Sequence, residues 1–416
     1  MWQLLKDPRM RRIVLANLFS SVGSGITMIG VPWLIVHRAN GDEVFGYTTL
    51  ATTFLLFFAS PYIGALIDRF SRKKLLLASE VISGTSVAVF AVWGFLSGHF
   101  ETWQLIGVYF GGSLYYSIHF PTQFAFTQEI FTREQYKSLN SVLEVQNQSA
   151  SMIAGGLASL LIDHVDYSWI LMADALTYVA GFLLFLSIPY QRIRAEEENG
   201  AATSMWQNIG EGFRYLKERP LLTLFFLCAL MPFIGVMLGN YLFPVYVTNV
   251  LRSSAAVLGG SDMIYAFGAA LAGLTVPLLI RKMGSYGTVV VTFVTFTLSI
   301  LTMYLFPAVG VFLAFKIFNG WGNAGTRVAR NTIMMETVPN HVMGRVNSFF
   351  SAAGMGMRVL VIGSATQIVA YAGAEQALLM LVGLLAVAFL GVFTSRKLFS
   401  EPVCKNPSNT LGNFRT

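Results

Sequence analysis

The stretch that decides the fold is Gly64-Ala65-Leu66-Ile67-Asp68-Arg69-Phe70-Ser71-Arg72-Lys73-Lys74, which places five charges between two long apolar runs. These runs, at about 45–67 and 75–97, are each long enough to cross a bilayer core roughly 30 Å thick, which takes about 20 residues. Lysine and arginine concentrate in short loops on the cytoplasmic side of a membrane. The stretch therefore predicts a cytoplasmic connection between two membrane-spanning helices.

Similar apolar runs continue along the chain on both sides of this stretch. Twelve of them have a spanning length, at about 13–36, 45–67, 75–97, 104–128, 139–162, 169–190, 220–249, 259–280, 287–306, 309–334, 347–371 and 376–395. An even number of spans places both termini on the same side of the membrane. With the 64–74 stretch in the cytoplasm, we expect an all-α membrane protein whose two termini are both cytoplasmic.

The distribution of the 28 lysine and arginine residues supports this topology. On this assignment 22 of them lie in cytoplasmic loops or tails, and only Arg38 and Arg252 lie on the other side. The remaining four fall inside apolar runs: Lys316, Arg327, Arg330 and Arg358. A charge in that position costs roughly 2.5–3.5 kcal/mol on insertion scales, so we expect each to be functional or paired.

Composition excludes several classes of function. Only 12% of the residues are charged, against about 25% in an ordinary soluble domain. The net charge is +7, but the basic residues border the spans instead of forming one patch, so the expected partner is an anionic lipid surface and not a nucleic acid. Two cysteines and five scattered histidines show no metal-ligand spacing, and no phosphate-binding or nucleophile motif is present. We therefore expect no metal, no cofactor, no catalytic residue and no enzyme activity.

One long polar stretch divides the spans into two groups of six. It covers 191–219, and in its second part apolar residues recur at helical spacing from Trp206 to Leu216, which predicts an amphipathic helix. The expected parts are an N-terminal six-helix bundle at 1–190, a cytoplasmic linker with an amphipathic helix at 191–219, a C-terminal six-helix bundle at 220–396 and a cytoplasmic tail at 397–416.

The two halves look related. Ser138-Leu139-Asn140-Ser141 opens the fifth span and Arg345-Val346-Asn347-Ser348 opens the eleventh. A patch of small residues follows at a similar distance in each, Gly155-Gly156-Leu157-Ala158 and Ile362-Gly363-Ser364-Ala365. Weak internal symmetry of this kind is typical of transporters built from two repeated halves.

The 64–74 stretch resembles the loop signature of the major facilitator superfamily, G-x-L-a-D-R-x-G-R-[KR]-[KR], with Ser71 in place of a glycine. This resemblance implies twelve transmembrane helices in two pseudo-symmetric six-helix bundles, which rock around a cavity near the bilayer midplane. It also implies a small-molecule substrate.

Further segments resemble one branch, the drug–proton antiporters that include macrolide-efflux proteins and enterobactin-type siderophore exporters. The matching segments run through most of the chain: Phe19-Ser20-Ser21-Val22-Gly23-Ser24, Val31-Pro32-Trp33-Leu34, His119-Phe120-Pro121-Thr122, Met172-Ala173-Asp174-Ala175-Leu176-Thr177-Tyr178, Leu242-Phe243-Pro244-Val245-Tyr246-Val247 and Gly344-Arg345-Val346. The branch implies export of a bulky amphipathic compound, driven by protons, across a bacterial inner or plasma membrane.

Two segments depart from the pattern of this branch. The fourth span holds no arginine at Phe110-Gly111-Gly112-Ser113, where the branch commonly has one, and Gly155 stands where the antiporter signature has proline. The residue that carries the proton must therefore be sought elsewhere.

The resemblance assigns a conformational latch to Gly64, Asp68, Arg69 and Arg72. An acid beside cations at a helix end can bond to a neighbouring helix terminus in one conformation and lose that bond in another. Anchoring by the positive-inside rule is the alternative for the cations, but it does not explain Asp68.

Three acids in or near the spans are candidates for proton coupling: Glu144, Asp174 and Glu80. A carboxyl group in an apolar setting can take up and release a proton near neutral pH. The alternatives are contact with water near the interface for Glu144, and structural hydrogen bonds for Asp174 and Glu80.

Polar residues within the spans indicate a substrate cavity. Glu144, Asn147 and Ser151 are spaced by three or four and share one helical face, which lipid cannot satisfy, so this face should point between the halves. Arg358 lies near the midplane, where it needs an anionic substrate or an acid from another helix. The candidates for the substrate cavity are Arg358, Asn147, Ser151, Asn240, Tyr116 and Ser24.

The other three cations inside the spans have simpler explanations. Lys316 is close enough to the outer end of its span to reach water along its flexible stem. Arg327 and Arg330 lie nearer the cytoplasm, where Glu336 or lipid phosphate can pair with them.

These observations together predict a secondary active transporter that exports a drug, such as a macrolide, or a siderophore by alternating access. Uptake or lysolipid flipping by the same fold is the alternative within transport. A membrane-embedded enzyme or a sensor is the alternative from another class.

Overall fold

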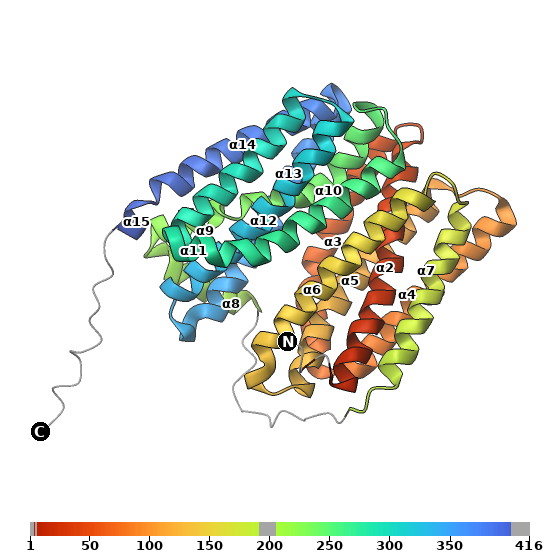
Figure 1. Ribbon diagram of the computed structural model, residues 1–416, viewed down its shortest axis with the longest axis horizontal. Coiled ribbons are helices and arrows are strands. Elements are labelled where there is room, and N and C mark those ends of the chain that lie inside the picture. Colours follow the sequence, from red (N-terminus) through yellow and green to blue (C-terminus); the bar gives the residue numbers. More distant parts are fainter. Residues whose placement is uncertain (1–3, 5, 191–204, 401–416) are drawn as a thin grey trace, which may run out of the picture.

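The computed structural model describes residue 4 and residues 6–190 and 205–400, and these contain helices and no strands. Segment 191–204 of the expected linker and segment 401–416 of the expected tail lie outside the described residues. Two helical bundles stand side by side, the N-terminal one at the right of Figure 1 and the C-terminal one at the left.

The N-terminal bundle has six long helices. They are α2 (Pro8–Val36), α3 (Gly41–Arg69), α4 (Arg72–Ser97), α5 (Thr102–Ile130), α6 (Tyr136–Leu161) and α7 (Tyr167–Leu186), with the short 3₁₀ turn η1 (Arg133–Gln135) before α6. Local chemistry sets several helix ends. Asp7 accepts a hydrogen bond from the backbone N–H of Arg9 at the start of α2, and Gly98 ends α4 with a φ of 69°, which favours glycine.

The C-terminal bundle makes six crossings with helices of unequal length. They are α9 (Pro220–Cys228), α10 (Met231–Asn249), α11 (Ala255–Leu305), α12 (Val309–Thr337), α13 (Asn340–Ala372) and α14 (Ala374–Thr394). α9 and α10 form one crossing, broken just before Pro232. α11 makes two crossings because it bends at Gly284, whose φ of 76° favours glycine. Each of the twelve expected spans coincides with one crossing.

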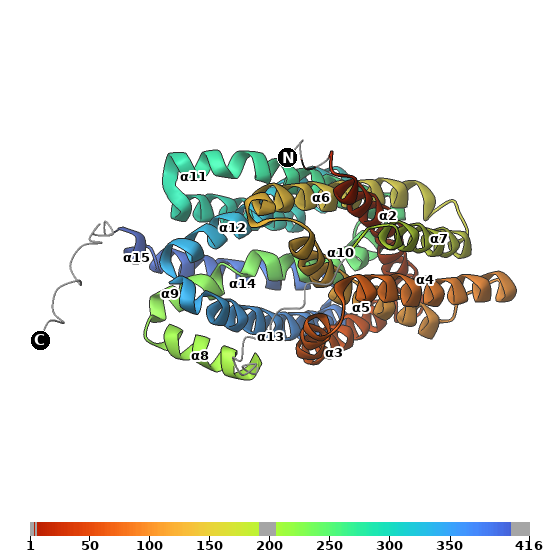
Figure 2. The ribbon, with the colours of Figure 1, turned by 90° about the horizontal axis from the view of Figure 1, so that it is seen from below.

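The expected amphipathic segment forms α8 (Met205–Lys217), which packs against α13. Figure 2 shows it along the outside of the C-terminal bundle. Leu216 is fully buried, and Glu211 Oε2 lies 2.8 Å from Arg345 Nε of α13. The side chain of Trp206 lies outside the described part of the chain. A short helix, α15 (Lys397–Ser400), follows α14.

Eight helices of the described chain are long and apolar enough to cross a membrane by length and composition, and α11 is one of them. The three long helices that fall short are α5, α6 and α12. They carry polar side chains such as His119, Glu144 and Arg327. Since lipid cannot satisfy such groups, these helices belong in the interior of the protein.

Candidate functional site

The two ends of the helices differ in charge. Arg9, Arg72, Lys73, Arg281 and Arg396 lie at one of them, which we call the basic end. The turns that follow α2, α4, α6 and α10 lie at the other, which we call the opposite end.

A cavity of about 970 Å³ lies between the two halves. Residues of α2, α3, α5 and α6 line it on one side, and residues of α10, α12 and α13 line it on the other. It extends to Gly64 and Ile67 near the basic end of α3. Its volume lies near the top of the range of about 300–1,000 Å³ that is usual for sites of drug-sized ligands, so a bulky compound fits.

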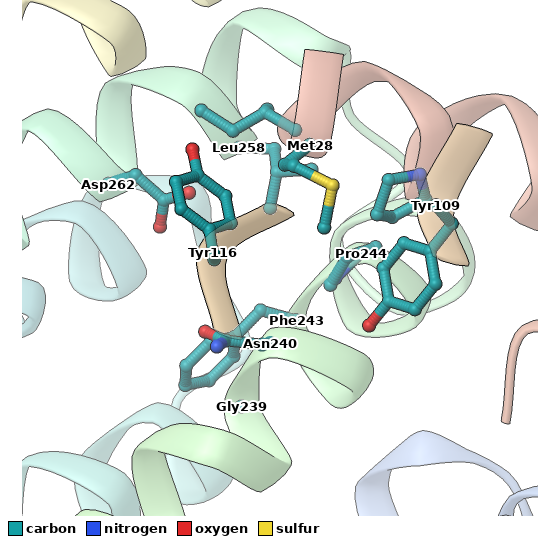
Figure 3. A pocket seen from close by; sticks show the side chains of 11 residues that line it. Met28, Tyr109, Tyr116, Gly239, Asn240, Phe243, Pro244, Leu258 and Asp262 are labelled. Atoms are coloured by element: carbon teal, nitrogen blue, oxygen red, sulfur yellow. The ribbon is translucent and has the colours of Figure 1, made fainter. Parts of the chain in front are cut away.

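A smaller chamber of about 270 Å³ shares residues with the main cavity (Figure 3). Met28, Tyr109, Tyr116 and Asn240 line both spaces. Only the small chamber has residues of α11 in its wall, among them Asp262. The space between the halves therefore consists of a wide part that reaches the basic end and a narrow part against α11.

Most of the expected cavity residues line this space. Arg358, Asn147, Ser151, Asn240 and Tyr116 all belong to the wall of the main cavity. They come from four different helices of both halves. The fold thus brings together residues that lie more than 200 positions apart in the sequence.

Ser24 is placed differently from what the sequence suggested. It is buried inside the N-terminal bundle, where its hydroxyl lies 2.8 Å from the hydroxyl of Tyr116 and donates to the carbonyl of Ser20. Ser21 and Gly25, on the neighbouring face of α2, line the cavity instead. Ser24 positions Tyr116 from behind the cavity wall.

Arg358 has no ion pair within the described part of the chain. Its side chain lies in the cavity wall, and its buried Nε has no hydrogen-bond partner. A guanidinium group in such a place carries donors that a ligand can satisfy, and two parallel hydrogen bonds to a carboxylate or similar anion suit its geometry.

Glu144 pairs with Arg327 across the two halves. Arg327 Nη2 donates to Glu144 Oε1 over 3.2 Å, and both side chains are about half exposed, at 42% and 54% respectively. The sequence suggested Glu336 or lipid phosphate as the partner of Arg327, but Glu336 accepts a hydrogen bond from Ser285. The reason is tertiary: α6 and α12 face each other across the cavity.

Lys316 is buried and does not reach solvent. Only 3% of its side chain is exposed, and its Nζ lies 3.5 Å from Asp262 Oδ1 and 3.9 Å from the ring centre of Phe243. The predicted contact with water is wrong, because Asp262 of α11 pairs with Lys316 instead. An acid within an apolar run, at the end of Gly259-Gly260-Ser261-Asp262, was the signal that could have revealed it.

The other two coupling candidates lie inside the N-terminal bundle, away from the cavity wall. Asp174 accepts hydrogen bonds from Thr27 over 2.6 Å and from Thr177. Glu80 accepts from Ser20 over 2.8 Å and from Tyr115 over 3.0 Å. Both acids therefore have the structural hydrogen bonds that the sequence left open as an alternative.

The basic loop after α3 ties helices of the N-terminal bundle together in this conformation. Arg72 forms an ion pair with Glu129 of α5. Lys73 donates to the carbonyls of Leu186 and Ile188 at the end of α7, over 2.9 and 2.7 Å. Asp68 is in the last turn of α3, but its side chain lies outside the described residues. The latch assignment of Gly64, Asp68, Arg69 and Arg72 stays a prediction.

The opposite end is closed by contacts between the halves. Asp163 accepts hydrogen bonds from the backbone N–H groups of Ala255 (3.3 Å) and Ala256 (3.1 Å) at the start of α11. Asn249 donates to Asp42 of α3. A Cβ added at Gly155 of α6 would lie 2.6 Å from the carbonyl oxygen of Gly259, so the two backbones touch. The same end also joins Tyr47 to Gln367 over 2.8 Å.

Known proteins of similar sequence and fold are transporters. The chain is 22% identical over 339 residues to the multidrug efflux pump Tap of Mycolicibacterium fortuitum, covering 80% of this chain and 82% of Tap. It is 24% identical over 403 residues to the enterobactin exporter EntS of Salmonella typhimurium, covering 93% of this chain and 94% of EntS. The crystal structure of the nucleoside transporter NupG superposes with a TM-score of 0.70 at 13% identity, covering 95% of this chain and all of NupG.

The family profile described as Major Facilitator Superfamily matches residues 13–362, which is most of the chain. The all-helical fold of twelve crossings and the cavity between two halves agree with that match. This chain is a multi-pass membrane transporter and belongs to the Major Facilitator Superfamily.

Proposed function

We propose that this transporter exports a bulky amphipathic compound with an anionic group, by alternating access and driven by protons. The single observation that carries the proposal is the large cavity between the halves with an unpaired arginine, Arg358, in its wall. Similarity to a multidrug efflux pump and to an enterobactin exporter supports the direction of transport and the size of the substrate.

The charge distribution supports a cytoplasmic location for the basic end. Basic residues concentrate at that end, as the positive-inside rule requires of the cytoplasmic side of a bacterial inner or plasma membrane. Both termini are then cytoplasmic, and the cavity reaches the cytoplasmic side while the opposite end is closed. A compound inside the cell can enter the cavity in this conformation, which is the first step of export.

The charges of the cavity wall favour an anionic substrate. The two acids in the wall each have a cation as partner, Glu144 with Arg327 and Asp262 with Lys316. Among the described residues no acid pairs with Arg358, and its buried Nε has no hydrogen-bond partner. Because an unpaired charge at this depth is costly, an anionic group on the substrate would stabilise the loaded protein.

Aromatic and apolar residues supply the rest of the binding surface. Tyr109, Tyr116 and Phe120 of α5 and Phe233 of α10 line the main cavity. Flat rings with few polar groups suit the apolar body of an amphipathic compound.

The proposal is tested with purified protein in inside-out vesicles with an acidic lumen. The probes are a naphthalene sulfonate and a naphthyl trimethylammonium ion, which share a ring system but differ in charge. We expect the wild type to accumulate the sulfonate and not the ammonium ion. Accumulation only in right-side-out vesicles would mean uptake, and preference for the cation would overturn the role of Arg358.

Arg358 variants separate a substrate role from a structural one. Arg358→Met should unfold at the wild-type temperature in detergent but not transport the sulfonate, because no protein acid loses its partner. Arg358→Lys should transport weakly, since it keeps the charge and loses the two-pronged hydrogen bond. A destabilised Arg358→Met would instead indicate a protein carboxylate as the partner.

A further inference from the structure

A row of polar side chains connects a buried acid to the wall of the cavity. Glu80 and His119 have side chains that are 0% and 2% exposed, with Glu80 Oε1 3.4 Å from His119 Nδ1. His119 Nε2 lies 3.0 Å from Asn17 Oδ1, and Asn17 Nδ2 donates to Gln146 Oε1 over 3.3 Å. Gln146 Nε2 donates to Asn147 Oδ1 over 3.1 Å, and Asn147 lines the cavity.

The directions of these hydrogen bonds fix the tautomer of His119. Asn17 uses its N–H group toward Gln146, so its oxygen accepts and His119 Nε2 carries the hydrogen. A neutral imidazole has one N–H, which leaves Nδ1 without a hydrogen and facing Glu80. Ser79, 3.5 Å from Nδ1, donates its hydroxyl to a backbone carbonyl of its own helix.

One proton is therefore required between Glu80 and His119. Without it, two atoms that can only accept would face each other in a buried site, which is unfavourable. The hydrogen bonds that Glu80 accepts from Ser20 and Tyr115 suit either charge state. With the proton present, the carboxyl group donates to Nδ1 and the whole row is satisfied.

After loss of that proton, a second arrangement again gives every donor and acceptor of the row a hydrogen-bond partner. The carboxyl proton passes to Nδ1, Nε2 gives its hydrogen to solvent, and the pair has lost one proton in total. Nε2 then needs a donor, so the amide of Asn17 must turn over. Gln146 and Asn147 must turn with it, because each amide has its donor and its acceptor on opposite sides.

We propose that Glu80 and His119 form a proton-sensing pair, whose state the amides of Asn17 and Gln146 transmit to Asn147 in the cavity. With the pair protonated, Asn147 has its N–H group available to the cavity. After proton loss it has its carbonyl oxygen available. A substrate that donates a hydrogen bond to Asn147 from a hydroxyl or N–H group therefore favours release of the proton, and the two events are linked.

The surroundings of the pair contain other titratable groups. α5 contributes Tyr115, α7 contributes Asp174 and Tyr178, and both of these α7 residues interact electrostatically with Glu80. α2 contributes Ser20 and Asn17, which carry no charge. The test must therefore distinguish titration of Glu80 from titration of Asp174.

The inference deepens the proton-driven export proposed above, and a measurement without substrate tests it separately. The other four histidines are replaced by glutamine, so that ¹⁵N-histidine labelling reports only His119. They are His37, His99, His164 and His341. Nuclear magnetic resonance of the protein in liposomes then identifies the protonated ring nitrogen at each pH.

We expect Nε2 to carry the hydrogen on the acidic side of a transition and Nδ1 to carry it on the alkaline side. Glu80→Gln should abolish the transition, because its amide N–H donates to Nδ1 at every pH. Asp174→Asn should keep it. One tautomer throughout, or a transition that survives Glu80→Gln, would overturn the pairing.

Transmission to the cavity is tested from the other end of the row. Asn17→Asp keeps the acceptor of Nε2–H and removes the N–H group that Nε2 needs after proton loss, so the transition should move to higher pH by about one unit or more, the equivalent of one hydrogen bond. Ser79→Ala, the matched control beside the same ring, should not move it. Asn147→Asp, which can only accept from Gln146, should move the transition in the same direction by a smaller amount. An unchanged midpoint in both Asn17→Asp and Asn147→Asp would overturn the transmission, whether or not the protein exports anything.

Discussion

The opposite end and the basic end hold the same two halves together by different means. At the opposite end the backbones of α6 and α11 touch at Gly155 and Gly259, and Asp163 caps the start of α11 from the other half. Near the basic end, the ion pair found between the halves is Glu144–Arg327, and both of its side chains are about half exposed.

The difference indicates where the conformational equilibrium is set. Close backbone packing is lost as a unit when helices separate, whereas an exposed ion pair contributes only about 0.2–1 kcal/mol. Opening of the opposite end should therefore be the costly step. The predicted latch at Gly64, Asp68, Arg69 and Arg72 would act when the basic end closes.

The largest effect is expected from Gly155→Ala. The added Cβ would lie 2.6 Å from the carbonyl oxygen of Gly259 and 2.7 Å from the backbone nitrogen of Met263. Overpacking against backbone typically costs about 1–3 kcal/mol, which corresponds to roughly a 5- to 150-fold shift in a two-state equilibrium. Transport should fall sharply while the opposite end opens more often.

A single cysteine at Met28, in a variant without Cys228 and Cys404, reports that opening. Met28 lines both chambers, so an impermeant maleimide added from the opposite side should label Met28→Cys faster in Gly155→Ala. Gly156→Ala is the control, because its Cβ would meet only the flexible side chain of Met263 at 3.3 Å. Equal labelling in both variants would show that the contact between α6 and α11 does not control opening of the opposite end.

Asp262→Asn is expected to destabilise the protein next most strongly. It leaves Lys316, whose side chain is 3% exposed, without its counter-charge. Breaking a fully buried pair costs about 3–5 kcal/mol; because Asp262 is 42% exposed to the cavity, we expect about 1–3 kcal/mol. The measurement is thermal unfolding in detergent.

The reverse variant sharpens this prediction. Lys316→Met leaves only the partly exposed acid unpaired, so it should cost less than Asp262→Asn. The double variant should then be more stable than Asp262→Asn alone, because the buried unpaired cation is gone. A double variant that is less stable than Asp262→Asn would mean that Lys316 has another essential partner.

Asp163→Ala should lower the free energy of opening the opposite end by about 1 kcal/mol, the usual value of a helix cap. Maleimide labelling of Met28→Cys from the opposite side should rise about fivefold, since 1.4 kcal/mol corresponds to a factor of ten. Asp166→Ala provides a matched control, because Asp166 caps α7 of its own half through Ser168. It should lower stability without faster labelling; faster labelling in it too would point to general loosening.

Much of the fold was predictable from the sequence because a bilayer imposes simple rules on it. Apolar length identified the crossings, including the two that α11 joins across Gly284. Charge placement predicts which end faces the cytoplasm, and this sidedness stays a prediction. The segment with helical spacing after the first half was predicted as an amphipathic helix, and α8 is that helix.

The site was predictable only where helical spacing distinguishes one face. Asn147 and Ser151 share a face of α6 that lines the cavity. On α2 two neighbouring faces are both polar: Ser24 with Ser20, and Ser21 with Gly25. Nothing in the sequence chooses between them, so Ser24 was misplaced. The partner of Lys316 is 54 positions away on another helix, and such pairing depends on tertiary packing that no local pattern shows.

The smallest effect is expected from Glu144→Gln, which removes the ion pair near the basic end. Both partners are about half exposed, so the loss should be about 0.2–1 kcal/mol. Transport should change less than about fivefold, and the change should shrink at high salt because exposed charges are screened. Glu336→Gln, at the same end but bonded within its own half, is the control.

The response of transport to an imposed pH gradient should persist in Glu144→Gln, because Glu80 and His119 are proposed to hold the exchangeable proton. If Glu144→Gln binds the naphthalene sulfonate but its transport does not respond to the pH gradient, Glu144 is the residue that holds the exchangeable proton. The basic end would then carry the energy coupling, and the weaker of the two contacts between the halves would be the one that drives transport.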